Sequence, residues 1–136
     1  MSAQLDRLNK RLTAIPKAVR EAVPPALAKS GEELAGRMKI LAPEDSGDLK
    51  ESIAVTLPGQ STPPYSQPGG SRVAKENEVL VTAGNSAVRY PHLVEYGTSK
   101  APAQPYFWPA FRLTRKRITN RLRRAIAKAV REGWQK

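Results

Sequence analysis

The chain has 136 residues, a length typical of a single domain. It contains no cysteine, which excludes disulfides, thiol chemistry and cysteine-ligated zinc. The formal net charge is +11, of which residues 112–136 carry +9 and residues 1–111 only +2, and no run of about 18 apolar residues is present. We therefore expect a domain without a membrane span or membrane contact, whose C-terminal segment needs a partner of opposite charge.

The first element that we expect is a long N-terminal helix. Apolar residues at helical spacing extend over residues 3–22 and continue over residues 25–41: Leu5, Leu8, Leu12, Ile15, Val19, Leu27, Leu34, Met38 and Leu41. Pro16 and the pair Pro24-Pro25 interrupt this pattern, and a proline inside a helix removes a donor and clashes with the preceding turn. We predict a helix that is kinked or broken at these prolines and that stops at Pro43.

An acidic turn and a first strand follow this helix. Asp45, Ser46 and Gly47 are turn-forming residues, and Ser46 is placed to cap a short helical turn over residues 48–51. The acids of this segment lack the alternating spacing of a calcium loop, so we interpret them as helix-start residues and expect no metal site. They are Glu44, Asp45, Asp48 and Glu51. Alternating apolar residues at 53, 55 and 57 then predict a strand.

The connection from Pro58 to Asn77 is long and has no apolar periodicity. Loops of this length in a small domain are usually functional or disordered. Two alternatives are open, a mobile hairpin tip or an arm that becomes ordered against a neighbouring subunit. The next residues, 78–83 (EVLVTA), predict a second strand, and Gly84-Asn85-Ser86 predicts a turn.

The last third of the chain ends in a basic helix. Residues 87–96 fit either a strand or a short helix after Pro91, and Gly97 ends that element. From Pro109 a helix runs nearly to the C-terminus, with one apolar stripe. The stripe contains Phe111, Ile118, Leu122, Ile126, Val130 and Trp134. These elements predict one α+β domain, with an N-terminal helical segment at 1–43, a small antiparallel sheet with a long hairpin loop at 44–104, and a long basic C-terminal helix at 105–136.

Residues suited to catalysis are few. His92 is the single histidine, and Glu95 would share its face of a helix, but a structural or surface role for this pair is the more common outcome. Gly69-Gly70 is not followed by the lysine–serine pair of a phosphate-binding loop. We therefore predict that the protein is not an enzyme and binds no cofactor.

The basic helix predicts contact with an acidic surface. A charge run with one acid among its neighbours repels itself, and phosphate or a carboxylate-rich partner would relieve this repulsion. Base-reading residues cannot be singled out, so non-specific contact with DNA and contact with an acidic protein both fit. The residues predicted to make this contact are Arg112, Arg115, Lys116, Arg121, Arg123, Arg124 and Lys128.

Two sequence blocks resemble the head–tail joining, or tail-completion, proteins of long-tailed double-stranded DNA phages and prophages. The first block matches at Ala42, Pro43, Ser46, Gly47, Leu49, Ser52 and Ile53. The second matches at Tyr90, Val94, Glu95, Tyr96, Gly97, Thr98, Pro105, Tyr106, Pro109 and Ala110. Pro91 and His92 depart from the pattern, as does the strongly basic tail.

The resemblance implies a structural virion protein of the neck that joins or completes the head–tail connection. It implies a homo-oligomeric ring, of six or twelve copies, around the DNA path. The implied partners are head-closure or connector proteins on one side and tail terminator or tube proteins on the other, with assembly in the host cytoplasm and a final location in the neck of the virion. An alternative without this resemblance is a small nucleic-acid-binding protein that uses the basic C-terminal helix.

The second block also contains the residues that we predict at the partner or subunit interface. Three prolines at 102, 105 and 109 stiffen the segment and lower the entropy lost when it is fixed against a partner. Tyr96, Tyr106 and Trp108 are predicted to be partly exposed contacts, because their polar tips can face water. Phe107 and Phe111 are predicted to be core. Glu95 is predicted to bond either a backbone amide or a basic residue of a neighbouring subunit.

Overall fold

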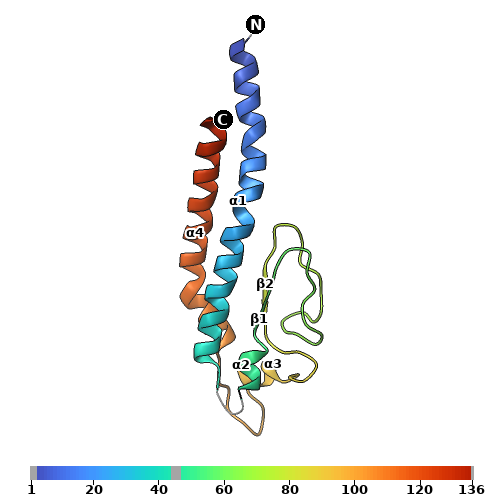
Figure 1. The fold of residues 1–136 in the computed structure, drawn as a ribbon. Coiled ribbons are helices and arrows are strands. Elements are labelled where there is room, and N and C mark those ends of the chain that lie inside the picture. The colour runs from blue at the N-terminus through green and yellow to red at the C-terminus, as the bar shows by residue number, and fades with distance from the viewer. Residues whose placement is uncertain (1–2, 44–46, 136) are drawn as a thin grey trace.

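The computed structural model describes residues 3–43 and 47–135, and two antiparallel helices dominate its elongated shape (Figure 1). The elements in chain order are α1 (Ala3–Leu41), α2 (Asp48–Glu51), β1 (Ala54–Thr56), β2 (Leu80–Thr82), α3 (Pro91–Tyr96) and α4 (Phe107–Gln135). The predicted α+β class, with a long helix at each end and a small antiparallel sheet between them, is confirmed.

The first helix is continuous through its prolines. α1 contains 39 residues with Pro16, Pro24 and Pro25 inside it, so the predicted break is wrong, although the predicted end before Pro43 is correct. A proline in a helix interior costs about 3 kcal/mol. Packing against α4 over much of the length of α1 offsets this cost, because most helical stability in proteins comes from burial of one face rather than from propensity.

Small residues form the contact between α1 and α4. Ala26 and Ser30 of α1, and Ala110, Thr114 and Ala129 of α4, are all buried. In the predicted stripe of larger residues on α4, Ile118 packs against the core and Leu122 is half-buried, whereas Phe111, Ile126, Val130 and Trp134 are exposed. The stripe therefore describes the buried face only in part, because the two helices approach closely where side chains are short.

The sheet packs on α1 at a glycine. β1 and β2 are antiparallel, with Val55 opposite Val81. A Cβ atom on Gly31 would lie 3.0 Å from a methyl carbon of Val55 and 2.9 Å from one of Val79. The absence of a side chain at Gly31 thus allows the apolar face of the sheet to contact the helix backbone. The predicted strands are confirmed, although both are shorter than the patterns suggested.

The long connection folds back on its own domain. Within it Ser61 pairs with Val73, and near its middle Gln67 pairs with Ala83 at the end of β2 through two backbone hydrogen bonds of 2.8 and 3.0 Å. Thr62 and Ser66 are buried under this crossing. The connection is thus paired with its own domain at Gln67, whereas contact with a neighbouring subunit stays a prediction.

The core lies where the C-terminal half of α1, the sheet and the first turns of α4 meet. Met38, Ala83 and Tyr106 are among its most buried residues. Ser52 ties α2 to the sheet, because its hydroxyl donates to Leu49 O (2.7 Å) and accepts from Gly84 N (3.0 Å). The turn predicted at Asp45 and Ser46, with Glu44 before it, lies outside the described residues. Over the described ranges, none of the helices has a stretch long and apolar enough to cross a membrane.

Candidate functional site

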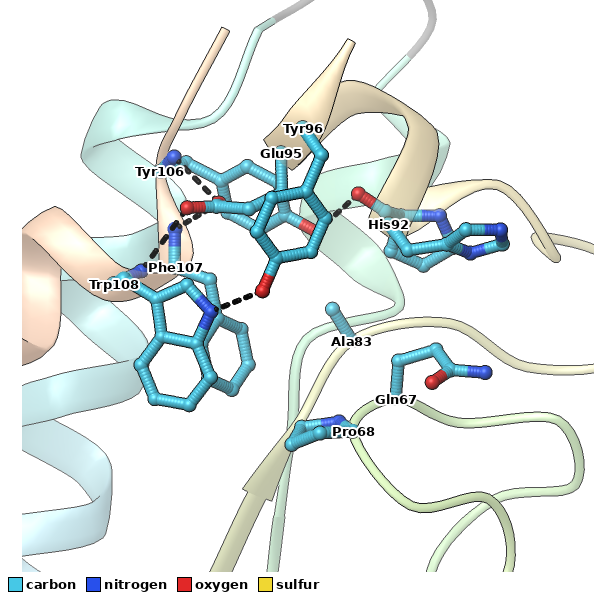
Figure 2. Close-up of a pocket in the computed structure, with 10 residues that line it drawn as sticks. Gln67, Pro68, Ala83, His92, Glu95, Tyr96, Tyr106, Phe107 and Trp108 are labelled. Atoms are coloured by element: carbon cyan, nitrogen blue, oxygen red, sulfur yellow. Dashed lines mark hydrogen bonds between the residues drawn. The ribbon is translucent and has the colours of Figure 1, made fainter. Parts of the chain in front are cut away.

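Glu95 caps a helix to which it does not belong. Its Oε1 accepts hydrogen bonds from the backbone N–H groups of Tyr106 (2.9 Å) and Phe107 (2.8 Å), and its Oε2 accepts one from Trp108 (3.4 Å) (Figure 2). The first turn of α4 contains no acidic residue of its own. The buried carboxylate therefore supplies both the acceptors and the negative charge that a helix N-terminus requires.

Of the two partners predicted for Glu95, the structure shows backbone amides, and they belong to the same chain. His92 lies on the exposed side of α3, one turn earlier. Because the Glu95 carboxylate is directed at α4, the alternative of a His92–Glu95 pair is wrong.

The segment between α3 and α4 is shaped to bring this cap into place. Gly97 ends α3 with a φ of +78°, and a Cβ atom there would lie 2.6 Å from the backbone nitrogen of Ala103. The chain turns at Thr98, whose side-chain oxygen accepts from the N–H groups of residues 100 and 101. It then returns to α3, where Gln104 N donates to Val94 O (2.8 Å). The Val-Glu-Tyr-Gly-Thr motif is thus one corner that delivers Tyr106 to Glu95.

Tyr106 is part of the core, so the prediction that it is partly exposed is wrong. Its side chain is 1% exposed, and its hydroxyl donates to Pro91 O at 3.4 Å. Burial raises the pKa of the Tyr106 phenol above its ordinary value of 10.0, and the negative charge of Glu95 raises this pKa further. The hydroxyl therefore stays protonated as a donor at the bottom of the corner.

Two aromatic side chains remain on the surface above it. Tyr96 is 68% exposed and Trp108 is 37% exposed, and the Trp108 Nε1–H donates to the Tyr96 hydroxyl at 2.7 Å. Phe107 packs against the core as predicted, and its ring contacts Trp108 edge-to-face at 5.0 Å. Phe111 is exposed beside Trp108 rather than buried, so its assignment to the core is wrong. The exposure predicted for Tyr96 and Trp108 agrees with the structure.

A shallow pocket of about 160 Å³ opens beside this aromatic pair (Figure 2). It is lined by Gln67, Pro68, Ala83, Pro91, His92, Glu95, Tyr96, Tyr106, Phe107 and Trp108. This volume is below the roughly 300–1,000 Å³ typical of small-molecule sites. The pocket is suited to one or two side chains of another protein. Across the part of the chain that the structure describes, no group of three or more histidine and carboxylate side chains could hold a metal ion.

Sequence reasoning did not find the contribution of Gln67 and Pro68 to this pocket. These residues come from the long connection and reach the pocket through the pairing of Gln67 with Ala83. No local pattern in the sequence indicates that pairing, because it depends on how the connection crosses the end of β2.

The basic residues predicted for contact with DNA or an acidic partner divide into two groups. Six of them are exposed on α4, namely Arg112, Arg115, Lys116, Arg123, Arg124 and Lys128. Arg121 instead points toward α1, where it donates to Ser30 Oγ (3.0 Å) and pairs with Glu33 (3.1 Å). Its side chain thus lies in the contact between α1 and α4, and not on the exposed face with the other six bases.

Comparison with known proteins gives one match. Residues 6–97 match the family described as “Bacteriophage HK97-gp10, putative tail-component”. No curated protein and no solved structure matches the chain. The matched range includes α1, the sheet and α3 with Glu95 and Tyr96, and it ends at Gly97. This match favours a phage component and lends no support to the nucleic-acid-binding alternative.

Proposed function

This chain belongs to the HK97 gp10-like family of phage tail components, and from that premise we propose that it is a ring subunit of the neck. In this role it surrounds the DNA path and joins or completes the connection between head and tail. Its neighbours in this proposal are head-closure or connector proteins on one side and tail terminator or tube proteins on the other. The protein acts by binding alone, as a structural component of the virion.

The observation that carries this proposal is the exposed aromatic pair on a rigid corner. Tyr96 and Trp108 are held by a mutual hydrogen bond, and the corner beneath them is fixed by the Glu95 cap. Aromatic residues that are already ordered lose little entropy on binding and are frequent hot spots of interfaces. The adjoining pocket offers space for a side chain from a second subunit or a partner.

A closed ring of identical subunits requires two different surfaces that fit one another. We propose that the Tyr96–Trp108 corner is one of these surfaces. The exposed bases of α4 are proposed to face DNA in the channel or an acidic neighbour, since they lie outside the contact with α1.

The proposal is tested by deleting the gene from the phage or prophage that carries it and imaging the particles by electron microscopy. We expect separate filled heads and finished tails, which the purified protein joins when it is added. Normal infectious particles from the deletion strain would overturn the proposal.

A pair of matched variants tests the aromatic corner in the same joining assay. Tyr96→Ala removes an exposed ring from the corner and should abolish joining while the protein remains folded. Ile40→Ala removes an exposed apolar side chain at the end of α1, away from the corner, and should leave joining unchanged. Equal activity of the two variants would remove the corner from the interface.

A further inference from the structure

The end of α1 extends beyond α4 and carries an apolar surface of its own. Gly133, close to the end of α4, lies beside Ile15 and Ala18, because a Cβ atom there would be 3.1 Å from Ile15 Cα and 3.4 Å from Ala18 Cβ. Residues 3–10 of α1 therefore extend beyond the end of α4 by about 12 Å. They lie at the end of the antiparallel helix pair where both termini are found (Figure 1).

The face of α1 that packs on α4 continues into this extension. Leu5 and Leu8 stand three residues apart, and Ile15 follows seven residues after Leu8, the spacing of one face of a helix. Leu5 is 48% exposed and Leu8 is 40% exposed. Where α4 covers this face, it includes Ile15, Ala18 and Ala26; beyond the end of α4, it includes Leu5 and Leu8.

Exposed apolar residues also lie near the C-terminal end of α4. Val130 and Trp134 are exposed, and they flank Ala129 and Gly133, which are buried. We call this end of the two helices the hairpin end; its exposed apolar residues include Leu5 and Leu8 of α1 and Val130 and Trp134 of α4. It lies at the opposite end of the long helices from α3 and the Tyr96–Trp108 corner (Figure 1).

An apolar surface of this kind favours an added helix. A helix end whose apolar face is unpacked has marginal stability, because helices in proteins are stabilised mainly by burial of that face. Burying an exposed leucine side chain stabilises the complex that buries it. A third helix laid against Leu5 and Leu8 would continue the packing that α4 provides farther along α1.

The charges around the hairpin end indicate which charge a bound helix should carry. Arg7 and Lys10 outnumber Asp6 on the extension. Near the end of α4, Lys128 and Glu132 pair at 3.9 Å, which leaves the positive charge of Arg131 in excess. A second copy bound through the same surface would bring the same local positive charges to this site, and like charges brought together disfavour binding.

We propose that the hairpin end binds an acidic amphipathic helix of a different protein. The apolar face of this partner helix covers Leu5 and Leu8. Its carboxylates lie close to the excess positive charges of Arg7, Lys10 and Arg131. This surface is separate from the corner proposed for ring formation. Its test uses the purified full chain alone, so its failure is distinguishable from failure of the neck role.

The probe is a fluorescently labelled synthetic peptide of three heptads with leucine at positions a and d and glutamate at e and g. A second peptide of the same composition has its leucines rearranged so that they share no face. Binding is measured by fluorescence anisotropy at physiological salt. We expect the patterned peptide to bind about tenfold or more tightly than the rearranged one.

Two double variants with the same change in charge locate the site. Leu5→Glu with Leu8→Glu should weaken binding of the patterned peptide about tenfold or more. Ile40→Glu with Leu113→Glu, which alters exposed apolar residues away from the hairpin end, should change it less than about twofold. Equal effects of the two variants, or equal binding of the two peptides, would overturn the proposal. So would a dimer of the unmodified chain in sedimentation that Leu5→Glu with Leu8→Glu dissociates, because a second copy would then be the occupant.

Discussion

At the scale of single residues, Glu95 illustrates how a charge is accommodated in the interior of a small domain. The carboxylate is buried, yet three backbone N–H groups bond it and the positive end of α4 faces it. These are the first N–H groups of a helix, which have no partner within the helix itself. The same hydrogen bonds thus stabilise the buried carboxylate of Glu95 and provide acceptors for the first N–H groups of α4.

Replacement of Glu95 by alanine should lower the free energy of unfolding by about 2 kcal/mol, because the first N–H groups of α4 would lose their acceptors. Glu95→Gln should cost less, since an amide oxygen still accepts a hydrogen bond. Urea denaturation followed by circular dichroism measures both changes. Glu76→Ala, at an exposed loop position, is the control and should be within about 0.5 kcal/mol of the unmodified protein. Equal stability of Glu95→Ala and the unmodified chain would contradict the capping role.

Tyr106 makes stability depend on alkaline pH. The folded state raises the pKa of its phenol above the unfolded value of 10.0, so the folded state holds the proton more tightly. Its contribution to stability is fully present below pH 10 and decreases as the pH rises above 10, by about 1.4 kcal/mol per pH unit. Tyr106→Phe should remove this part of the decrease, whereas Tyr65→Phe should retain it. Denaturant midpoints between neutral pH and pH 11 measure the difference, and parallel curves for Tyr106→Phe and the unmodified protein would rule the effect out.

At the scale of elements, the contact between α1 and α4 depends on short side chains. Ala26 and Ser30 of α1 lie within this contact with Thr114 and Ala129 of α4, and all four are buried. Arg121 adds an ion pair with Glu33 across the same two helices. We attribute the continuity of α1 through its three prolines to this close packing against α4.

Lengthening a side chain within this contact should therefore push the two helices apart. Ala129→Leu should destabilise the protein by about 1–3 kcal/mol, because extra methylene groups in a filled contact force strain on their neighbours. Ala127→Leu makes the same substitution two residues earlier on the exposed face and should change stability by less than about 0.5 kcal/mol. Thermal denaturation compares them, and similar melting temperatures would show that this contact is loosely packed.

At the scale of the whole molecule, positive charge is concentrated on α4. The outer face of α4 carries the exposed bases, and the net charge of the chain is +11. Arg112→Glu with Arg123→Glu should reduce head–tail joining about tenfold or more, because it reverses charges on the face proposed to meet DNA or an acidic neighbour. Lys17→Glu with Lys39→Glu makes an equal change of net charge at exposed positions of α1 and should leave joining nearly intact. Equal loss in both variants would indicate that total charge matters and its position does not.

The local pattern of the sequence predicted the element types well. Helical spacing identified α1 and α4, alternation identified β1, residue type identified β2, and Gly97 marked the end of α3. These features depend on neighbours a few residues apart, so they are readable without a fold. The same reasoning gave a buried face of α4 that is correct only in part, because it followed the largest apolar residues, and Ile126 and Val130 are exposed.

What the sequence alone determined is the class of the domain, its charge asymmetry and the aromatic segment that carries the resemblance to phage neck proteins. Only the tertiary structure decided that Glu95 caps α4, that Tyr106 is buried and that Arg121 faces α1. It alone showed that Leu5 and Leu8 extend past the end of α4. Each of these facts depends on which segments come to lie side by side after the chain has turned back. Burial and hydrogen bonding are properties of that arrangement, and residue spacing does not specify it.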